Sequence, residues 1–497
     1  MGYITGFDRN QITLFPQSID ELIEEGNPVR VIDAFVNTLD VIELGFRDVG
    51  QNQIGRPPYH PSDLLKLYIY AYMNRYRSSR VIEQECKRNI ELIWLIKGLK
   101  PDHNTISNFR RDNPKPIKKV FRKTVSIARN MDLIGGILIA GDSTKLRAQN
   151  SKKNNYNQKK IDRHLRYIND KIEAYNKELA MADEDEKPEI NNNINHLHNR
   201  KENYQDIEAE LKKSGERQIS TSDPESRHLI TRNNITEVAY NIQTSVDAKN
   251  HIPLDFKVTN NNDSKAMGNM LQRAKSILHT NDFTALYDKG YHTGSEFKKA
   301  NDLGIDVMVA IPAVAAQAPN PDYNVDAFEY NQDENYYLCP QNHKLTTTGA
   351  WHKAKTYYFK RYTTRACIQC PVKAQCTKAK YGKGIQRSEY QAYVNQNKEK
   401  IEKNKDYYRK RQSIVEHPFG TIKRQWGFNY TITKTGMNRA SADVGFMFIA
   451  YNLKRLINLL GIDQMRGLFY SILQFWYRNF TIYPRRTTII QSGDCFN

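Results

Sequence analysis

The order of strand-like and helix-like segments between residues 134 and 311 constrains the fold of this chain more than any other feature. Residues 134–142 (IGGILIAGD) are apolar and rich in β-branched side chains, which predicts a buried strand. Residues 236–260 alternate polar and apolar side chains, which predicts two strands joined by a turn at 248–251. Further along come a helix at 264–278, a strand at 283–287, a helix at 295–303 and a strand at 306–311. This order predicts an α/β protein with a mixed sheet.

The same order resembles the ribonuclease H-like fold, in which three antiparallel strands precede parallel ones and helices cover the sheet. We predict such a core together with an amino-terminal all-helical domain, a helical insertion and a cysteine-containing insertion. The predicted segments are a helical domain at 1–132, the first core strand at 133–151, the helical insertion at 152–234, the middle of the core at 235–311, the cysteine-containing insertion at 312–404, the final core helices at 405–465 and a tail at 466–497.

The apolar run at 444–460 predicts a buried helix, because Lys454 and Arg455 interrupt it and it is too short to span a bilayer. The amino terminus lacks the basic start and apolar stretch of a secretory signal. Six cysteines in 497 residues do not resemble a secreted disulfide scaffold. We therefore expect a cytoplasmic protein.

The charge of the chain points to a polyanionic partner. Lys and Arg number 74 against 55 Asp and Glu, a formal net charge of +19. Such an excess on a soluble protein attracts nucleic acid. A short predicted helix at 104–111 follows a turn and ends in Arg110 and Arg111, as a helix-turn-helix reader of DNA does. The alternative is a packing helix with solvated arginines.

Three acidic residues occur at positions where catalytic residues are often found. Asp142 and Asp288 each end an apolar strand, and Glu416 lies on a predicted late helix. Any one of them alone is more often a helix cap or a solvated loop residue. In the predicted sheet, however, the first and fourth strands are neighbours, so the two aspartates converge and the late helix brings the glutamate beside them. Three carboxylates repel one another unless cations such as Mg²⁺ or Mn²⁺ neutralise them, and a pair of such ions serves phosphodiester chemistry.

The sequences around these acids are GDSTKLRAQNSKK at Asp142, YDKGYHTGSEF at Asp288 and VEHPFGTIKRQWG at Glu416. They closely resemble the three acidic motifs of the DDE transposases of bacterial insertion sequences. The resemblance implies that the three acids are a catalytic triad that binds Mg²⁺ or Mn²⁺. It also implies that the helical beginning binds DNA, and that the chain belongs to a branch with a cysteine-bearing insertion before the glutamate.

Related elements carry a Tyr, Arg, Glu and Lys signature around the glutamate. Here Tyr408 and Arg411 keep the first spacing, and Glu416 and Lys423 keep the last. The middle spacing departs, because four residues rather than three separate Arg411 from Glu416. The resemblance implies that Lys423 holds a phosphate of the terminal DNA, with Arg411 as a further DNA contact. The alternative for Lys423 is an ordinary solvated lysine.

The cysteine-containing insertion carries the pattern of half a zinc site. Cys367 and Cys370 have the spacing of a zinc knuckle, and Cys376 follows. Cys339 completes a set of four thiolates, or His343 replaces one of them. A structural Zn²⁺ would tie together a segment that is poor in apolar residues. The alternative is four reduced thiols without a metal.

The resemblance implies a transposase that binds the terminal inverted repeats of its own element and carries out metal-dependent cleavage and strand transfer. Its partner is double-stranded DNA, and joining two ends implies a homodimer or a larger synaptic complex. The place of action is the bacterial cytoplasm, on the nucleoid while DNA is bound. Two alternatives stay open: a ribonuclease H-like nuclease that cuts without joining, and a catalytically inactive DNA-binding protein descended from such an enzyme.

Overall fold

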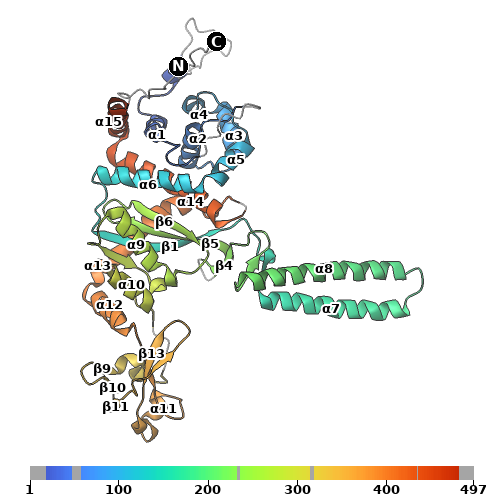
Figure 1. Ribbon diagram of the computed structural model, residues 1–497, viewed down its shortest axis with the longest axis vertical. Coiled ribbons are helices and arrows are strands. Elements are labelled where there is room, and N and C mark those ends of the chain that lie inside the picture. Colours follow the sequence, from blue (N-terminus) through green and yellow to red (C-terminus); the bar gives the residue numbers. More distant parts are fainter. Residues whose placement is uncertain (1–17, 47–56, 232–234, 314–317, 434, 481–497) are drawn as a thin grey trace, which may run out of the picture. The chain divides into compact units, whose positions relative to one another are not determined.

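The computed structural model describes residues 18–46, 57–231, 235–313, 318–433 and 435–480 (Figure 1). The chain forms two compact units. The first combines Met1–Asn130, Arg147–His228 and Thr421–Asn497, and the second combines Met131–Leu146 and Leu229–Gly420. Among the described helices, none combines the length and the apolar character that a membrane crossing requires. Residues 481–497 of the predicted tail lie outside the described residues.

A six-stranded sheet is the core of the second unit. Its strands are β1 (Leu138–Arg147), β4 (Arg227–Ile230), β5 (Thr236–Asp247), β6 (Pro253–Thr259), β7 (Thr284–Tyr287) and β8 (Asp306–Val309). The order is β4-β5-β1-β7-β8, and β6 also pairs with β5. β7 runs parallel to β1, β8 runs parallel to β7, and β6 runs antiparallel to β5. The predicted mixed α/β sheet, with its first and fourth strands adjacent, is therefore confirmed.

The first strand differs from the prediction in its bounds. It begins at Leu138 and runs on to Arg147, so Asp142 lies inside β1 rather than at its end. Parallel pairing with β7 covers only Leu138 to Ala140, opposite Thr284 to Leu286. At Gly141 a side chain would lie 2.0 Å from the ring of Tyr287, so this position accepts only glycine. Beyond it β1 parts from β7, which leaves the next residue at an open edge.

Helices from the predicted helical segments pack on this sheet, together with one at 391–403 that lies in the predicted cysteine-containing insertion and was not predicted. They are α9 (Met267–Leu278), α10 (Gly294–Asp302), α12 (Gln391–Lys403) and α13 (Lys405–Phe419). α13 buries Ile414 and Val415 against Ala140 of β1 and Val246 of β5. After Phe419 the helix widens into a π-helical segment, Gly420–Gln425. α13 therefore starts where the sequence predicted it and is anchored directly over the first strand.

The cysteine-containing insertion is built from short elements. Two three-stranded sheets have the orders β11-β10-β9 and β12-β13-β14. Their bounds are β9 (Glu329–Asn331), β10 (Tyr336–Leu338), β11 (Lys344–Leu345), β12 (Trp351–Lys353), β13 (Tyr358–Tyr362) and β14 (Ile385–Ser388), with the short helix α11 (Lys373–Cys376). The buried apolar cluster that holds them has five members: Phe328, Tyr337, Leu345, Tyr362 and Ile385. Such a core is small for a segment of this length.

The first unit is helical. Apart from the two helices of the helical insertion, its helices are α1 (Pro28–Asn37), α2 (Pro61–Met73), α3 (Ser79–Arg88), α4 (Ile90–Leu95), α5 (His103–Asp112), α6 (Pro114–Asn130), α14 (Met437–Leu460) and α15 (Ile462–Phe480). The apolar run predicted as a buried helix forms most of α14, which packs against α6 and α2. This arrangement differs from the predicted final core segment at 405–465, because the compact units separate after Gly420.

The helical insertion forms a long antiparallel hairpin, as predicted. Two β strands, β2 (Asn155–Tyr156) and β3 (Ile219–Ser220), close its base. Helices α7 (Gln158–Met181) and α8 (Lys187–Ser214) lie side by side (Figure 1). Its few buried apolar side chains lie along the seam between the two helices, so the remaining surface is polar.

Candidate nucleic-acid interface and candidate active site

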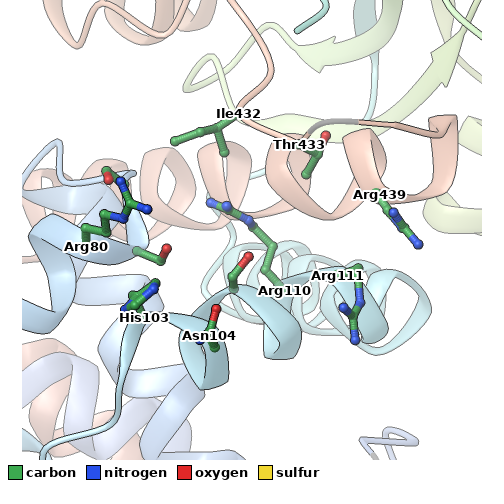
Figure 2. Close-up of a pocket in the computed structure, with 11 residues that line it drawn as sticks. Arg80, His103, Asn104, Arg110, Arg111, Ile432, Thr433 and Arg439 are labelled. Carbon is green, nitrogen blue, oxygen red and sulfur yellow. The ribbon is translucent and has the colours of Figure 1, made fainter. Parts of the chain in front are cut away.

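A basic cleft lies in the first unit between α3, α5 and the start of α14 (Figure 2). Its volume is about 560 Å³. Arg80, Arg111 and Arg439 are exposed at its walls, one from each helix. None of the described residues that line it is acidic, and Asn104 and Ser107 add polar groups. A cleft with this composition suits an anion such as a DNA phosphate.

The two arginines predicted at the end of the reader helix have different environments. Arg111 is exposed and forms a 2.7 Å ion pair with Asp112. Arg110 is buried, donates a 2.9 Å hydrogen bond to the Tyr72 hydroxyl and lies 3.8 Å from a carboxylate oxygen of Asp443. Its charge is therefore balanced inside the protein. That position fits a structural ion pair better than the predicted DNA contact, which leaves Arg111 as the exposed member of the pair.

Lys423, the predicted phosphate contact, belongs to the first unit. It is half-buried in the π-helical segment Gly420–Gln425. Glu416 belongs to the second unit, so the seven-residue spacing of the signature spans the boundary between the units. A role for Lys423 at the cut DNA end stays a prediction.

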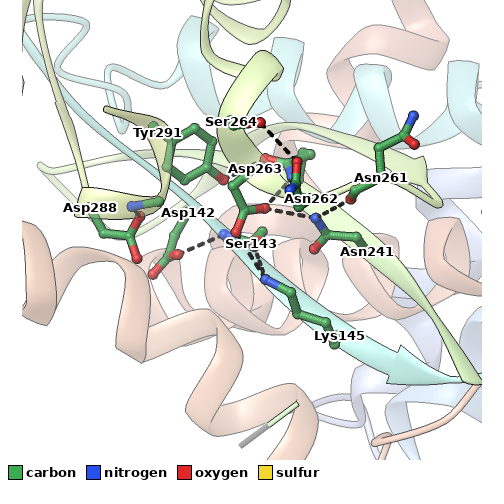
Figure 3. Close-up of polar contacts among 12 residues, drawn as sticks. Asp142, Ser143, Lys145, Asn241, Asn261, Asn262, Asp263, Ser264, Asp288 and Tyr291 are labelled. Carbon is green, nitrogen blue, oxygen red and sulfur yellow. Dashed lines mark hydrogen bonds and ion pairs between the residues drawn. The ribbon is translucent and has the colours of Figure 1, made fainter. Parts of the chain in front are cut away.

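Asp142 and Asp288 come together in the second unit (Figure 3). Asp142 lies in β1 directly after Gly141, and its Oδ1 accepts a 2.7 Å hydrogen bond from the Ser143 amide. Asp288 follows β7 directly, and its Oδ1 accepts a 2.8 Å hydrogen bond from the Gly290 amide. The backbone therefore fixes both carboxylates at the edge where the two parallel strands part.

The local electrostatics make this pair unfavourable without a positive charge. Burial raises the pKa of Asp142, and the negative charge of Asp288 raises it further. The nearby Arg411 and the hydrogen bond from Ser143 act in the opposite direction but do not cancel the rise in pKa. Two carboxylates placed in this way favour binding a proton or a cation.

Helix α13 places two residues of the transposase-like signature against the pair. The Arg411 guanidinium lies 3.0 Å from Oδ2 of Asp142. The Tyr408 hydroxyl donates a 2.8 Å hydrogen bond to the carbonyl of Tyr287, the residue before Asp288. Arg411, predicted as a DNA contact, therefore sits beside the acids and neutralises one of them.

Glu416 does not join the two aspartates. Its side chain is exposed and accepts a 2.9 Å hydrogen bond from Gln412. Five residues beyond Arg411 correspond to a rotation of about 140° around a helix, so the extra residue in the signature turns Glu416 away from the face that carries Arg411. Within the described residues, no group of three or more His, Cys, Asp or Glu side chains is arranged to hold a metal ion. The structure therefore brings together two of the three predicted acids.

Sequence reasoning missed a partly buried ion pair beside the aspartates (Figure 3). Lys145 of β1 lies 3.0 Å from Oδ2 of Asp263, and Asn241 and Gln243 each donate a 2.7 Å hydrogen bond to Oδ1. Burial opposes ionisation of Asp263, but Lys145 and Asn241 hold its pKa below the ordinary value. The signal that was available is the position of Asp263, shortly after the end of β6. Its bonds mark it as a support for the sheet edge that carries Asp142.

The four cysteines of the insertion surround one cavity. Cys339, Cys367, Cys370 and Cys376 line it together with His343, and all four thiols are free. The structure thus gathers the predicted set of thiols, while the metal itself stays a prediction.

A mixed sheet with paired carboxylates and a helical unit with a basic cleft is consistent with the α/β fold of a transposase. Residues 17–112 match the family model described as Transposase domain (DUF772), and residues 338–457 match the one described as Transposase DDE domain. These two matches support a DDE transposase of an insertion sequence. No curated protein and no solved structure matches it.

Proposed function

We propose that this transposase binds the terminal inverted repeats of its element, hydrolyses a phosphodiester at each end and joins the freed 3′-hydroxyl to target DNA. The observation that carries the proposal is the convergence of Asp142 and Asp288 from adjacent parallel strands. The family match to a transposase DDE domain supports it. A cytoplasmic location, with the nucleoid as the place of action, belongs to the same proposal.

The two aspartates fit a divalent cation, because burial and mutual repulsion disfavour two bare negative charges. Asp142 and Asp288 would hold Mg²⁺ or Mn²⁺, and Glu416, which lies apart from them in the structure, would have to turn toward the cation to act as the third carboxylate of the motif. Bound there, the cation would activate the attacking oxygen and stabilise the leaving one. Arg411 supplies the positive charge that Asp142 contacts in the structure.

The basic cleft of the first unit would hold the phosphate backbone of the element end. Its exposed arginines come from three helices, so a bound phosphate would be contacted from several directions. Arg439 donates a 3.1 Å hydrogen bond to the Thr435 hydroxyl, which directs its guanidinium. Phosphate contacts of this kind position a protein on DNA without reading its sequence.

We expect Arg439→Ala to lower the affinity for DNA about tenfold at low salt and to reduce the slope of log K against log salt concentration by about one. Loss of one phosphate contact releases one counterion fewer. Fluorescence anisotropy over a salt series measures both quantities. Arg122→Ala, which removes an exposed arginine of α6 outside the cleft, is the matched control. Equal salt slopes for the two variants would remove the cleft from the interface.

Glu416 is tested separately from the aspartates. We expect Glu416→Gln to lower the cleavage rate on the order of a hundredfold or more in Mg²⁺, because a carboxamide is a much weaker cation ligand than a carboxylate. Glu402→Gln, on the neighbouring helix α12, is the control and should cleave as the unchanged protein does. Full cleavage by Glu416→Gln would restrict the catalytic set to the aspartates.

The deciding experiment incubates the pure protein with Mg²⁺, a DNA fragment that carries the element ends and a target plasmid. Nicked or cut ends together with joined products support the transposase. Cut ends without joined products support a ribonuclease H-like nuclease, and binding without cutting supports an inactive DNA-binding descendant. A synaptic dimer predicts that two labelled ends are captured in one complex, which native gel electrophoresis with ends of two lengths detects.

A further inference from the structure

We propose that Cys339, Cys367, Cys370 and Cys376 bind one structural zinc ion that holds the cysteine-containing insertion together. The ligands come from two parts of the chain. Cys339 follows β10, and the other three lie at 367–376, after β13 and in α11. All four line one cavity of about 20 Å³, which has room for a single water-sized body.

Several contacts around the cavity suit thiolate ligands. The His343 amide donates a 3.2 Å hydrogen bond to Sγ of Cys339, a bond that stabilises negative charge on sulfur. At Gly382, whose φ is +100°, a side chain would lie 2.2 Å from Cβ of Cys367. Glycine at that position lets the backbone close over the thiol. Cys339 and Cys376 also pack against the small apolar cluster of the insertion, which keeps them at the cavity.

The side chains around the cavity carry charge opposite to that of the proposed zinc centre. A zinc ion held by four thiolates carries two net negative charges. Lys373 and Lys383 both line the cavity, and Lys383 is buried. The surroundings therefore provide the positive charge that such a centre needs.

The fold brings the four cysteines, which come from two parts of the chain, to one cavity. In the described part of the chain, no three His, Cys, Asp or Glu side chains are already placed so that they could hold a metal ion. Yet the four cysteines already line one cavity, so metal binding would require their side chains to turn toward a common point. A metal would add the stability that a core of five buried side chains lacks.

The test is the metal content of the full-length protein, purified without added metal and measured by plasma mass spectrometry. We expect about one zinc ion per chain. Cys367→Ser and Cys370→Ser should each lose it. His343→Ala and Cys495→Ser should both retain it, the latter removing a cysteine outside the described residues. Loss of zinc from His343→Ala with retention by Cys339→Ser would overturn the four-thiol ligand set.

A second measurement uses the unchanged protein, so that it does not depend on how the serine variants fold. Replacement of zinc by Co²⁺ should give the intense visible bands of tetrahedral cobalt thiolate. A thiol reagent should modify the four cysteines only after a strong chelator is added. Protein that contains no zinc and whose four thiols react freely without a chelator would refute the proposal. Neither readout involves DNA cleavage, so the outcome is independent of the catalytic assignment.

Discussion

Asp142→Asn and Asp288→Asn are each expected to lower the rate of DNA cleavage by on the order of a thousandfold or more. Each change removes one negative charge from a carboxylate pair while keeping nearly the same side-chain shape. The asparagine oxygen can still accept the backbone hydrogen bond that Ser143 or Gly290 donates. The folded structure should therefore persist, and the loss should fall on catalysis. Cleavage of a labelled element end in Mg²⁺ under single-turnover conditions measures it.

The control for this pair is Asp302→Asn. Asp302 ends α10 and forms an exposed ion pair with Lys298, so its replacement removes a charge at the surface. It should cleave as the unchanged protein does, and all three variants should bind DNA within a few-fold of it. Undiminished cleavage by Asp142→Asn or Asp288→Asn would remove the catalytic assignment.

Asp443→Ala is expected to lower the free energy of unfolding of the helical unit by about 3–5 kcal/mol. Asp443 is fully buried on α14, and its Oδ2 lies 2.6 Å from Arg77 and 2.9 Å from the Ile432 amide. It also accepts a hydrogen bond from the Tyr72 hydroxyl. Alanine would leave the buried charges of Arg77 and Arg110 without a counterion. Urea unfolding followed by far-ultraviolet circular dichroism measures the change.

The pH dependence follows from the same network. Burial alone would raise the pKa of Asp443, but Arg77 and Arg110 hold it below the ordinary value. A carboxyl with a lowered pKa in the folded state stabilises the protein above its unfolded pKa. That stabilisation is complete at neutral pH and is lost as the pH falls through the folded pKa.

The control for Asp443→Ala is Glu173→Ala, which removes an exposed ion pair with Lys177 and should leave the urea midpoint unchanged. Equal midpoints for the two variants would contradict the role of Asp443.

The sheet and its neighbours could be predicted from the sequence because strand and helix periodicities are local. The alternation in 236–260 becomes the β5 and β6 hairpin, and the apolar runs before Asp142 and Asp288 become parallel neighbours. The rules of sheet topology then bring these two acids together without any knowledge of side-chain packing. The polar character of 152–218 predicted its exposed helical hairpin in the same way.

Other features depend on contacts between distant segments. Arg110 lies at the end of a helix whose sequence resembles a DNA-reading helix. In the structure it is buried beside Asp443, which lies 333 residues later in the sequence. Asp263 and Lys145 are unremarkable in sequence, because their ion pair forms only when β1 lies beside the segment after β6. The predicted final core segment, 405–465, is divided between the two units, because the apolar face of α14 packs against α2 and α6 of the first unit.

The sequence by itself determined the resemblance to transposases, the mixed sheet and the meeting of two aspartates, since each follows from motifs, local pattern and chain order. Only the tertiary structure decided that Arg411 faces Asp142 while Glu416 points to solvent. One additional residue on a helix turns a side chain by about 100°. The outcome of that turn depends on which face of α13 the sheet buries, and that face is set by Ile414 and Val415 packing against β1 and β5.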